Sequence, residues 1–210
     1  MSTGPGRRGR SSRAERRTES LDRLQRSAES LTADGGSFSA LPVERLAAGA
    51  GMSRATFYIY FEDKAELVTS WFAQLAERIT EAGEPWWGAV EPVTPDTVRA
   101  TLAAVLAVYQ RHRTVFAAVE EMVPLDPRLR EVVEAEHALR VRQLAAHVRH
   151  GQEGGWIDSV LLADETAQWL TVMIERVATG VAVTDADAAA ALAESGAGVV
   201  WRALYARVAD

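Results

Sequence analysis

The sequence contains no cysteine and no long hydrophobic run. The absence of cysteine excludes disulfide bonds, thiol catalysis and cysteine-ligated zinc. No segment approaches the ~18 consecutive apolar residues that a membrane-spanning helix needs. The basic N-terminus is not followed by an apolar segment, so it is not typical of a secretory signal. Together these absences predict a cytoplasmic protein.

Charge is distributed unevenly along the 210 residues. The formal net charge of −6 by itself argues against binding to nucleic acid. Residues 1–64, however, carry eleven basic and eight acidic residues, whereas residues 65–210 carry twelve basic and twenty-one acidic ones. A basic N-terminal part on an acidic body is typical of a DNA-binding domain attached to a domain that does not bind DNA.

Helical periodicity extends over almost the whole chain. Hydrophobic residues make up 48% of the sequence and recur at spacings of three and four in successive segments. The segments expected to be helical begin near Ser20, Pro42, Arg54, Asp63, Thr94, Thr114, Asp126, Ala163 and Asp187. Neither an alternating strand pattern nor an internal repeat is present. The sequence therefore predicts an all-α fold of about nine helices.

The helix expected to start at Asp63 links the N-terminal part directly to the acidic body. Asp63 and Glu66 form a D-x-x-E capping pattern at its start. We expect it to end at Gly83–Pro85, which leaves Trp86 and Trp87 in the loop that follows. Its position makes this helix the natural route by which a change in the body reaches the N-terminal part.

Residues Pro42–Lys64 have the pattern of two short helices joined by a tight turn. The apolar residues of the first helix recur at spacings of three and four. Gly51 lies where the chain must reverse direction, and glycine tolerates the left-handed backbone that such a turn needs. Ser53 can cap a second helix that begins at Arg54. Two helices joined in this way are typical of the DNA-reading helix-turn-helix.

The same stretch resembles the signature of the TetR family of transcriptional regulators. The resemblance is carried by Val43, Leu46, Ala47, Ala50, Gly51, Met52, Ser53, Thr56, Phe57, Tyr58, Tyr60, Phe61, Lys64 and Leu67. It implies an N-terminal three-helix DNA-binding domain, a C-terminal ligand-binding domain and a homodimer formed by the last two helices. The body is most similar to the mycobacterial ethionamide-resistance repressor type, through Met173-Ile174-Glu175-Arg176 and the pair Trp201 and Tyr205.

Three parts of the chain are expected from composition and from this resemblance. Residues 1–17 are rich in Gly, Ser and Arg and are expected to form a disordered basic arm. The arm could enter a minor groove, or it could only add non-specific attraction to phosphates. Residues 18–64 are expected to form the helix-turn-helix domain, and residues 65–210 the ligand-binding and dimerisation domain.

Seven residues are candidates for contact with operator DNA: Ser53, Arg54, Ala55, Thr56, Tyr58, Tyr60 and Lys64. Arg54, Ala55 and Thr56 lie at the N-terminal end of the second helix, which is the end that enters the major groove. Arg54 can make a bidentate contact to guanine, and Thr56 can offer its hydroxyl or its methyl group. The resemblance implies phosphate contacts from Ser53, from both tyrosines and from Lys64. For Tyr58 and Tyr60, packing against the first helix is the alternative.

Ten residues of the body are candidates for a ligand pocket: Trp86, Trp87, Val98, Val105, Tyr109, Val133, His137, Trp169, Met173 and Trp201. Each apolar one could equally be an ordinary core residue, and the pocket itself is implied by the resemblance. His137 could anchor a ligand or could be a hydrogen-bonded core histidine. Glu175 and Arg176 are adjacent and face different directions, and each is interpreted as a member of an interface or inter-helix ion pair. His147 and His150 lack a third ligand for a metal and are expected at the surface.

No nucleophile motif, phosphate-binding loop or dinucleotide-binding motif is present, so neither an enzyme nor a cofactor is expected. Small residues of the last helix, Ala188–Ala191, Ala193 and Gly196–Gly198, suit a tight homodimer interface, with an Ala-rich surface helix as the alternative. The sequence thus predicts a repressor that a small apolar or amphipathic effector releases from palindromic operator DNA. The alternative is a helical carrier or protein-interaction module whose DNA reader is vestigial.

Overall fold

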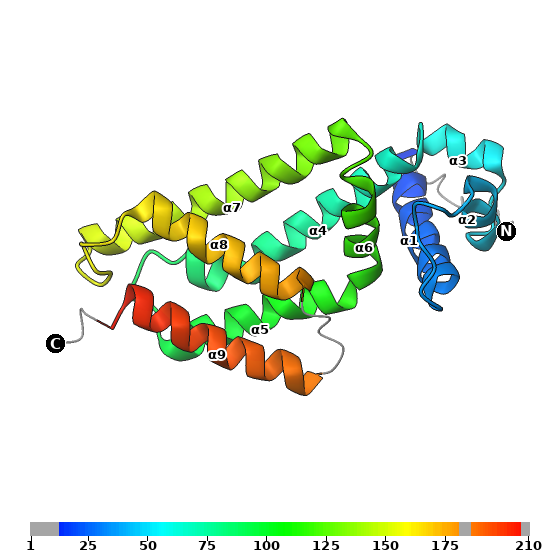
Figure 1. The fold of residues 1–210 in the computed structure, drawn as a ribbon. Helices are drawn as coiled ribbons and strands as arrows, with labels where there is room; N and C mark the ends of the chain where they lie inside the picture. Colours follow the sequence, from blue (N-terminus) through cyan, green and yellow to red (C-terminus); the bar gives the residue numbers. More distant parts are fainter. Residues whose placement is uncertain (1–12, 181–185, 207–210) are drawn as a thin grey trace, which may run out of the picture.

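The computed structural model describes residues 13–180 and 186–206, which contain nine α-helices and no strand (Figure 1). In chain order they are α1 (Arg13–Thr32), α2 (Val43–Gly49), α3 (Arg54–Tyr60), α4 (Lys64–Trp87), α5 (Pro95–Arg111), α6 (Arg113–Met122), α7 (Pro127–Glu153), α8 (Ala163–Gly180) and α9 (Ala186–Leu204). The all-α fold expected from the periodicity is confirmed. Within these ranges no helix is both long and apolar enough to cross a membrane.

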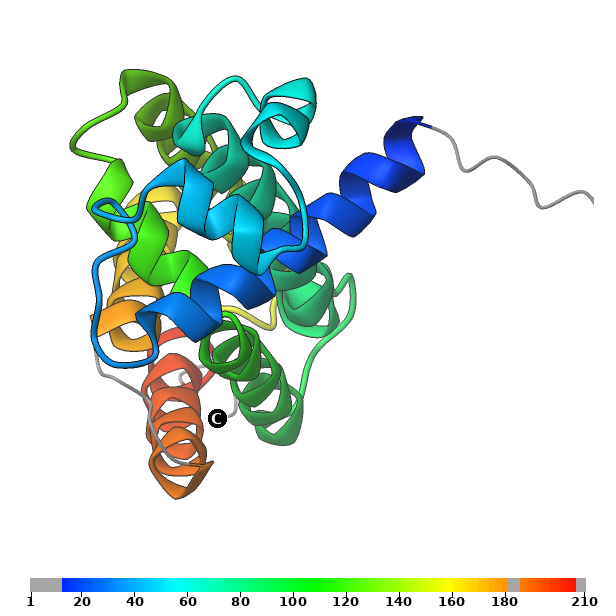
Figure 2. The same cartoon turned by 90° about the vertical axis from the view of Figure 1, so that its right-hand side faces the viewer.

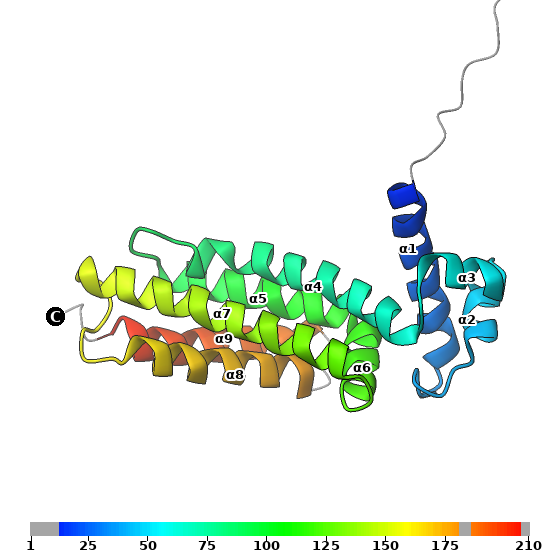
Figure 3. The same cartoon turned by 90° about the horizontal axis from the view of Figure 1, so that it is seen from above.

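Helices α1–α3 form a small domain at one end of an elongated body made by α4–α9 (Figures 1 and 3). Helix α4 belongs to both parts, since it starts beside α3 and then runs into the body between α5 and α7. When the molecule is viewed from the end that carries the small domain, α1 crosses in front of the body with α2 packed on it (Figure 2). The architecture therefore separates an N-terminal tip from the body and joins them through α4.

Side-chain caps fix the starts of the helices that were expected from the sequence. Asp63 caps α4 by accepting a hydrogen bond from the backbone N–H of Glu66 at 2.8 Å. Thr94 caps α5, and Asp126 caps α7. Each such cap satisfies backbone N–H groups that the first turn of a helix leaves free. The predicted starts of these three helices are confirmed.

Helix α1 starts earlier than the sequence pattern predicts. It begins at Arg13 instead of near Ser20, so residues 13–17 of the predicted arm are helical. Arg17 explains this extension, because its guanidinium donates to Glu66 and Ser70 of α4 and lies 4.9 Å from the centre of the Phe61 ring. These contacts with residues distant in sequence give no periodic apolar signal. Residues 1–12 of the predicted arm lie outside the described residues.

Helix α4 runs further than predicted. It continues through Pro85 to Trp87, so the expected end at Gly83–Pro85 was wrong and both tryptophans are helical. Proline inside a helix removes a hydrogen bond, but Trp86 is fully buried and anchors this last turn in the core. Burial of a large side chain outweighs the local preference of the glycine and the proline.

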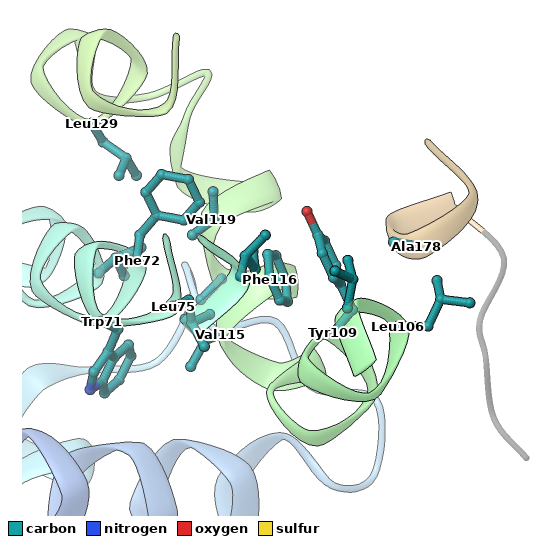
Figure 4. Packing of buried hydrophobic residues seen from close by; sticks show 14 of the residues in the cluster. Trp71, Phe72, Leu75, Leu106, Tyr109, Val115, Phe116, Val119, Leu129 and Ala178 are labelled. Carbon is teal, nitrogen blue, oxygen red and sulfur yellow. The ribbon is translucent and has the colours of Figure 1, made fainter. Parts of the chain in front are cut away.

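A continuous apolar core connects the body with the small domain (Figure 4). Trp71 and Phe72 project from α4, and the Tyr109 ring of α5 stacks on Phe116 of α6 with ring centres 4.1 Å apart. The Trp71 indole is fully buried and donates from its Nε1 to the carbonyl oxygen of Leu21 in α1 at 3.1 Å. Because one side chain of α4 is bound to α1 in this way, movement of α4 is coupled to the position of the small domain.

Candidate nucleic-acid interface and ligand cavity

Helices α2 and α3 form the expected helix-turn-helix. Gly51 in the turn has φ of 68°, the left-handed conformation that glycine adopts without strain. The Ser53 hydroxyl caps α3 by accepting from the backbone N–H of Thr56 at 3.0 Å. On the rear face of α3, Phe57 is fully buried, and Phe61, which follows the helix, is buried beside it. Helix α3 is thus fixed from behind, and its other face is left to the solvent.

The solvent-facing side of α3 presents the residues predicted to contact DNA. Ser53, Arg54, Ala55 and Tyr58 are exposed, and Thr56 and Tyr60 are half-buried. The Arg54 guanidinium pairs with Glu44 of α2 at 2.6 Å and lies 5.5 Å from the centre of the Tyr58 ring. Both partners of this ion pair are exposed, so the pair contributes little to stability and exchanges readily for another partner.

Lys64, the seventh candidate, is placed differently from the other six. Its ammonium group donates to three carbonyl oxygens of the loop between α1 and α2, those of Phe38 at 3.1 Å, Ser39 at 2.6 Å and Leu41 at 2.9 Å. An ammonium group has three N–H donors, and all three are used in this arrangement. Burial lowers the pKa of Lys64, and the negative charge of Glu121 partly offsets this shift. The prediction of a phosphate contact is therefore corrected to a role in holding this loop.

The same loop is bound to the body through Glu121 of α6. This carboxylate accepts from the backbone N–H of Ser39 at 2.7 Å and of Phe38 at 3.3 Å, and from the Ser37 hydroxyl at 2.7 Å. Burial acts to raise the pKa of Glu121, but these hydrogen bonds outweigh it and the pKa is lowered. The loop is thus held on its carbonyl side by α4 and on its N–H side by α6.

Arg128 makes a further connection between the body and the start of α4. It lies at the beginning of α7, and its guanidinium donates to Asp63 at 2.6 Å and to Asp126 at 2.9 Å. Asp63 is also the cap of α4, so one carboxylate both starts the helix and accepts from α7. Helices α6 and α7 therefore both contact the place where the small domain meets α4.

A cavity of about 20 Å³ lies inside the body between α4, α5, α7 and α8. Its apolar wall is formed by Ile79, Trp87, Val105, Tyr109, Leu144 and Ile174. Arg140, Thr171 and Glu175 are the polar residues that border it. An apolar cavity with a few polar groups is the usual form of a small-molecule site, although this volume holds little more than a water molecule.

Only three of the ten predicted pocket residues line this cavity: Trp87, Val105 and Tyr109. Met173 lines a second pocket of about 160 Å³ between α5, α8 and α9. Trp201 borders a third pocket, of about 200 Å³, between the start of α5 and α9. The predicted set therefore does not form one pocket.

The remaining apolar candidates also lie elsewhere. Val98 is fully buried in the core, and Val133 is partly buried and packs against the core. Trp86 is fully buried and donates from Nε1 to the hydroxyl of Tyr205 at 2.9 Å. Trp169 is 77% exposed on α8, which corrects its assignment to a pocket. The next residue, Leu170, lies on the inward face of α8. Because consecutive residues on a helix point about 100° apart, Trp169 is directed outward.

His137 belongs to a hydrogen-bonded chain that the sequence did not reveal. Its Nδ1 lies 2.7 Å from one oxygen of Glu175, and its Nε2 lies 3.1 Å from the side-chain amide of Gln168. The other oxygen of Glu175 accepts from Nε of Arg140 at 2.6 Å, so the predicted ion-pair role of Glu175 is confirmed. Arg176, for which an ion pair was also predicted, is exposed on α8.

Arg140 is the residue that sequence reasoning missed. It follows His137 by three positions and precedes Leu144 by four, on the inward stripe of α7. A charged residue on such a stripe requires a buried partner, and this requirement is the signal that could have identified it.

His147 was expected at the surface but is only 2% exposed, so that expectation was wrong. Its Nε2 lies 2.8 Å from the hydroxyl of Tyr205, and its Nδ1 lies 3.3 Å from the carbonyl oxygen of Ala89. A neutral imidazole protonated at Nδ1 satisfies both contacts, because Nδ1 then donates to Ala89 and Nε2 accepts from Tyr205. Burial lowers the pKa of His147 to about 4.

The small residues of α9 face α5 of the same chain. Ala193 and Ala197 are buried there, and a Cβ atom at Gly196 would lie 3.3 Å from Leu102. Close packing between α5 and α9 therefore explains these three positions, and the interpretation of them as dimer contacts is corrected. Among the described residues, no group of three or more His, Asp or Glu is arranged to hold a metal ion.

Comparison with known proteins agrees with this geometry. Residues 26–70 match the model of the bacterial regulatory proteins, tetR family, from the second half of α1 into α4. No curated protein sequence matches the chain. The matched family consists of regulators and not of enzymes, which agrees with the prediction that the chain is not an enzyme.

Several solved structures have the same fold. The TetR family regulator PfmR from Thermus thermophilus is similar with a TM-score of 0.67 and 22% identity, covering 86% of this chain and 98% of its own. A TetR regulator from Haloarcula marismortui has a TM-score of 0.67 and 18% identity, over 90% and 99% of the two chains. The fatty acid degradation regulator FadR from Bacillus halodurans has a TM-score of 0.67 and 16% identity, over 86% and 94%. The chain thus has the TetR-like fold, with a helix-turn-helix domain that matches the tetR family at its N-terminus.

Proposed function

We propose that the protein is a dimeric, cytoplasmic repressor of transcription that leaves palindromic operator DNA when a small, largely apolar ligand binds its body. The observation that carries this proposal is the orientation of α3. Its rear face is fixed by Phe57, whereas at its N-terminal end Arg54 is exposed and Thr56 is half-buried. This is the end of a recognition helix that enters a major groove.

Exposed apolar residues on the last two helices support dimerisation. Trp169 and Val172 of α8 and Val199 of α9 are large apolar side chains left in solvent. The two helices border one common pocket and lie along the same part of the body (Figure 3). An apolar surface of this kind marks a protein–protein contact, and a two-fold dimer matches the symmetry of a palindromic operator.

The contacts around Lys64 provide a route for release. In a dimer the two recognition helices must enter successive major grooves about 34–36 Å apart. A ligand that separates α4 from its neighbours in the body would move the loop held by Lys64 and Glu121, and with it α3. A hundredfold loss of operator affinity requires a difference of only about 2.7 kcal/mol between the two conformations. A body like that of the ethionamide-resistance repressor type fits this scheme, since Met173 and Ile174 line the pocket between α5, α8 and α9.

Binding to the DNA next to its own gene tests the proposal. We expect the purified chain to bind that intergenic DNA in a fluorescence-anisotropy titration, with an affinity that falls steeply as salt rises, because phosphate contacts release counterions. A small ligand that binds the protein should weaken this interaction, and the DNA should weaken ligand binding by the same factor. Binding that is absent or independent of sequence would contradict the proposal.

Replacing Arg54 with alanine is expected to relax sequence preference at one base pair of each half-site. The loss of a bidentate contact to guanine should remove about 1–3 kcal/mol of discrimination there. Competition with operators substituted one base pair at a time measures this directly. Glu44→Gln serves as the matched control, because it frees Arg54 from its ion pair and should keep the preference. If Arg54→Ala instead weakens all operators equally, Arg54 contacts phosphate.

Replacing Trp169 with aspartate is expected to convert the dimer to a monomer. An exposed aromatic side chain at the interface would be exchanged for a charge that must be desolvated on association. Light scattering coupled to size exclusion measures the mass, and operator affinity should fall with it. Leu125→Asp is the control, since Leu125 is also apolar and exposed but lies between α6 and α7. If the Trp169→Asp variant still has the mass of a dimer, Trp169 does not lie in the interface.

A further inference from the structure

The exposed face of α3 has an apolar centre. Phe57 is fully buried and defines the rear of this helix. Each residue of an α-helix turns by about 100°, so Ala55 and Ile59, two positions before and two positions after Phe57, point about 160° away from it. Both residues are exposed, and Ile59 is 60% exposed. One methyl group and one branched aliphatic side chain therefore form the middle of the face that is turned to the solvent.

Polar side chains lie on both sides of this apolar centre. By the same periodicity Arg54 and Tyr58 lie on one flank, where the guanidinium is 5.5 Å from the centre of the tyrosine ring. Thr56 and Tyr60 lie on the other flank and are half-buried. Within α3, Ile59 is the only aliphatic residue larger than alanine. The face thus carries one large aliphatic side chain between two polar borders.

The position of α3 separates Ile59 from the surface proposed for dimerisation. Helix α3 lies at the tip of the molecule, and α1 and α6 lie between it and α8 (Figures 1 and 3). A second copy that docks through α8 and α9 therefore leaves Ile59 exposed. The molecule proposed to meet the tip is the operator, so Ile59 faces DNA in the complex.

The major groove offers one apolar group to such a side chain. Base edges there present hydrogen-bond donors and acceptors, and thymine adds its C5 methyl group. An aliphatic side chain cannot pair with a donor or an acceptor, and covering one without a partner costs free energy. Contact with a methyl group instead removes apolar surface of both molecules from water, which is favourable. Isoleucine on this face therefore favours thymine over cytosine at the base that it covers.

We infer that Ile59 is a specificity-determining residue that reads the C5 methyl group of one thymine in each operator half-site. This inference rests on the proposed function, because it names what the recognition helix reads. Five residues of helix rise about 7.5 Å, and successive base pairs lie about 3.4 Å apart. The thymine therefore lies within about three base pairs of the guanine contacted by Arg54. Because 5-methylcytosine carries the same methyl group, Ile59 reads it in part as thymine.

Replacing thymine with deoxyuridine removes only this methyl group and keeps the pairing with adenine. Each thymine of the bound intergenic DNA is replaced in turn, and the affinity of the full chain is measured by fluorescence anisotropy. One thymine per half-site should show a loss of about fourfold, as the exposure of one methyl group predicts. At that position the Ile59→Ala variant should bind thymine and deoxyuridine equally. If the variant and the parent chain are equally sensitive at every thymine, the inference is overturned.

Leu125→Ala is the matched control, because it removes the same number of carbon atoms from an exposed site between α6 and α7. This variant should keep the full difference between thymine and deoxyuridine. If Ile59→Ala weakens thymine-containing, deoxyuridine-containing and unrelated DNA by the same factor, Ile59 contacts the sugar–phosphate backbone and the inference fails. Thermal melts of both variants confirm that they are folded.

Methylated cytosine provides the converse test. Exchange of the sensitive thymine–adenine pair for cytosine–guanine should weaken binding of the parent chain, and a C5 methyl group on that cytosine should recover about fourfold. Ile59→Ala should show no recovery, and a recovery of equal size in both proteins would contradict the inference. Sequence-specific binding without any methyl effect that depends on Ile59 would overturn this inference and leave the proposed function standing. Absence of sequence-specific binding would contradict both.

Discussion

A Lys64→Met variant is expected to lose about 2–3 kcal/mol of its free energy of unfolding. Methionine keeps the length of the side chain but removes all three N–H donors, so the carbonyl oxygens of Phe38, Ser39 and Leu41 lose their shared partner. The loop between α1 and α2 would then be held to the body chiefly by Glu121. Urea denaturation followed by circular dichroism measures the loss, and operator binding should weaken because α3 is less firmly placed.

A matched control separates this effect from the loss of a surface charge. Arg149 pairs with Asp164 at 2.5 Å on an exposed part of α7, so Arg149→Met removes a cation of similar length. Exposed pairs contribute at most about 1 kcal/mol, and stability should change little. If Lys64→Met were as stable as the parent chain but bound DNA poorly, the ammonium group would contact phosphate and not the loop.

Acidification from pH 7 to pH 4 is expected to remove up to about 3 kcal/mol of stability through His147 alone. Burial lowers the pKa of this imidazole to about 4, from an ordinary value of 6.5. Between these two values the unfolded chain binds a proton that the folded chain excludes, so stability falls as the pH decreases through this window. At or above pH 7 the histidine is neutral in both states, and it makes no pH-dependent contribution.

A His147→Gln variant isolates this contribution. Glutamine can occupy the polar site between Tyr205 and Ala89 without titrating. The free energy of unfolding of the variant should therefore depend less on pH between 7 and 4 than that of the parent chain. His150→Gln is the control for an exposed histidine lost outside the core. Because the charge of His150 also lowers the pKa of His147, this variant should change the pH dependence slightly, and by less than His147→Gln. Urea unfolding at several pH values gives the slope of the free energy of unfolding against pH for each protein. Titration of the carboxylates contributes equally to the slopes of all three proteins. Equal slopes for His147→Gln and the parent chain would show that His147 does not control acid sensitivity.

Local chemistry explains which features could be predicted from the sequence. The caps at Ser53, Asp63 and Asp126 act on backbone groups two or three residues away, so their spacing in the sequence is their spacing in the structure. The buried positions of Phe57 and Phe61 follow equally from helical periodicity around a known turn. The fold and the exposed face of α3 depend on such short-range relations.

The body could not be predicted to the same degree, because its contacts join residues far apart in the sequence. Nothing near Trp87 indicates that it borders the same cavity as Arg140, and nothing near Trp169 indicates that α8 turns it outward. Composition was misleading for Ala193 and Ala197, since small residues permit close packing against any helix, including one of the same chain. Lys64 has a similar explanation, because its three acceptors precede it by more than twenty residues.

Lys64 is also the only lysine in the 210 residues. A protease specific for lysine therefore has one bond to cut, between Lys64 and Ala65 in the first turn of α4. The enzyme cannot bind this side chain while its ammonium group is held by the loop, so cleavage requires that the small domain open away from α4 and that the first turn of α4 unwind. When opening and closing are fast, the rate of that single cut measures the population of the open form. The chain thus carries a built-in reporter of domain separation that needs no label.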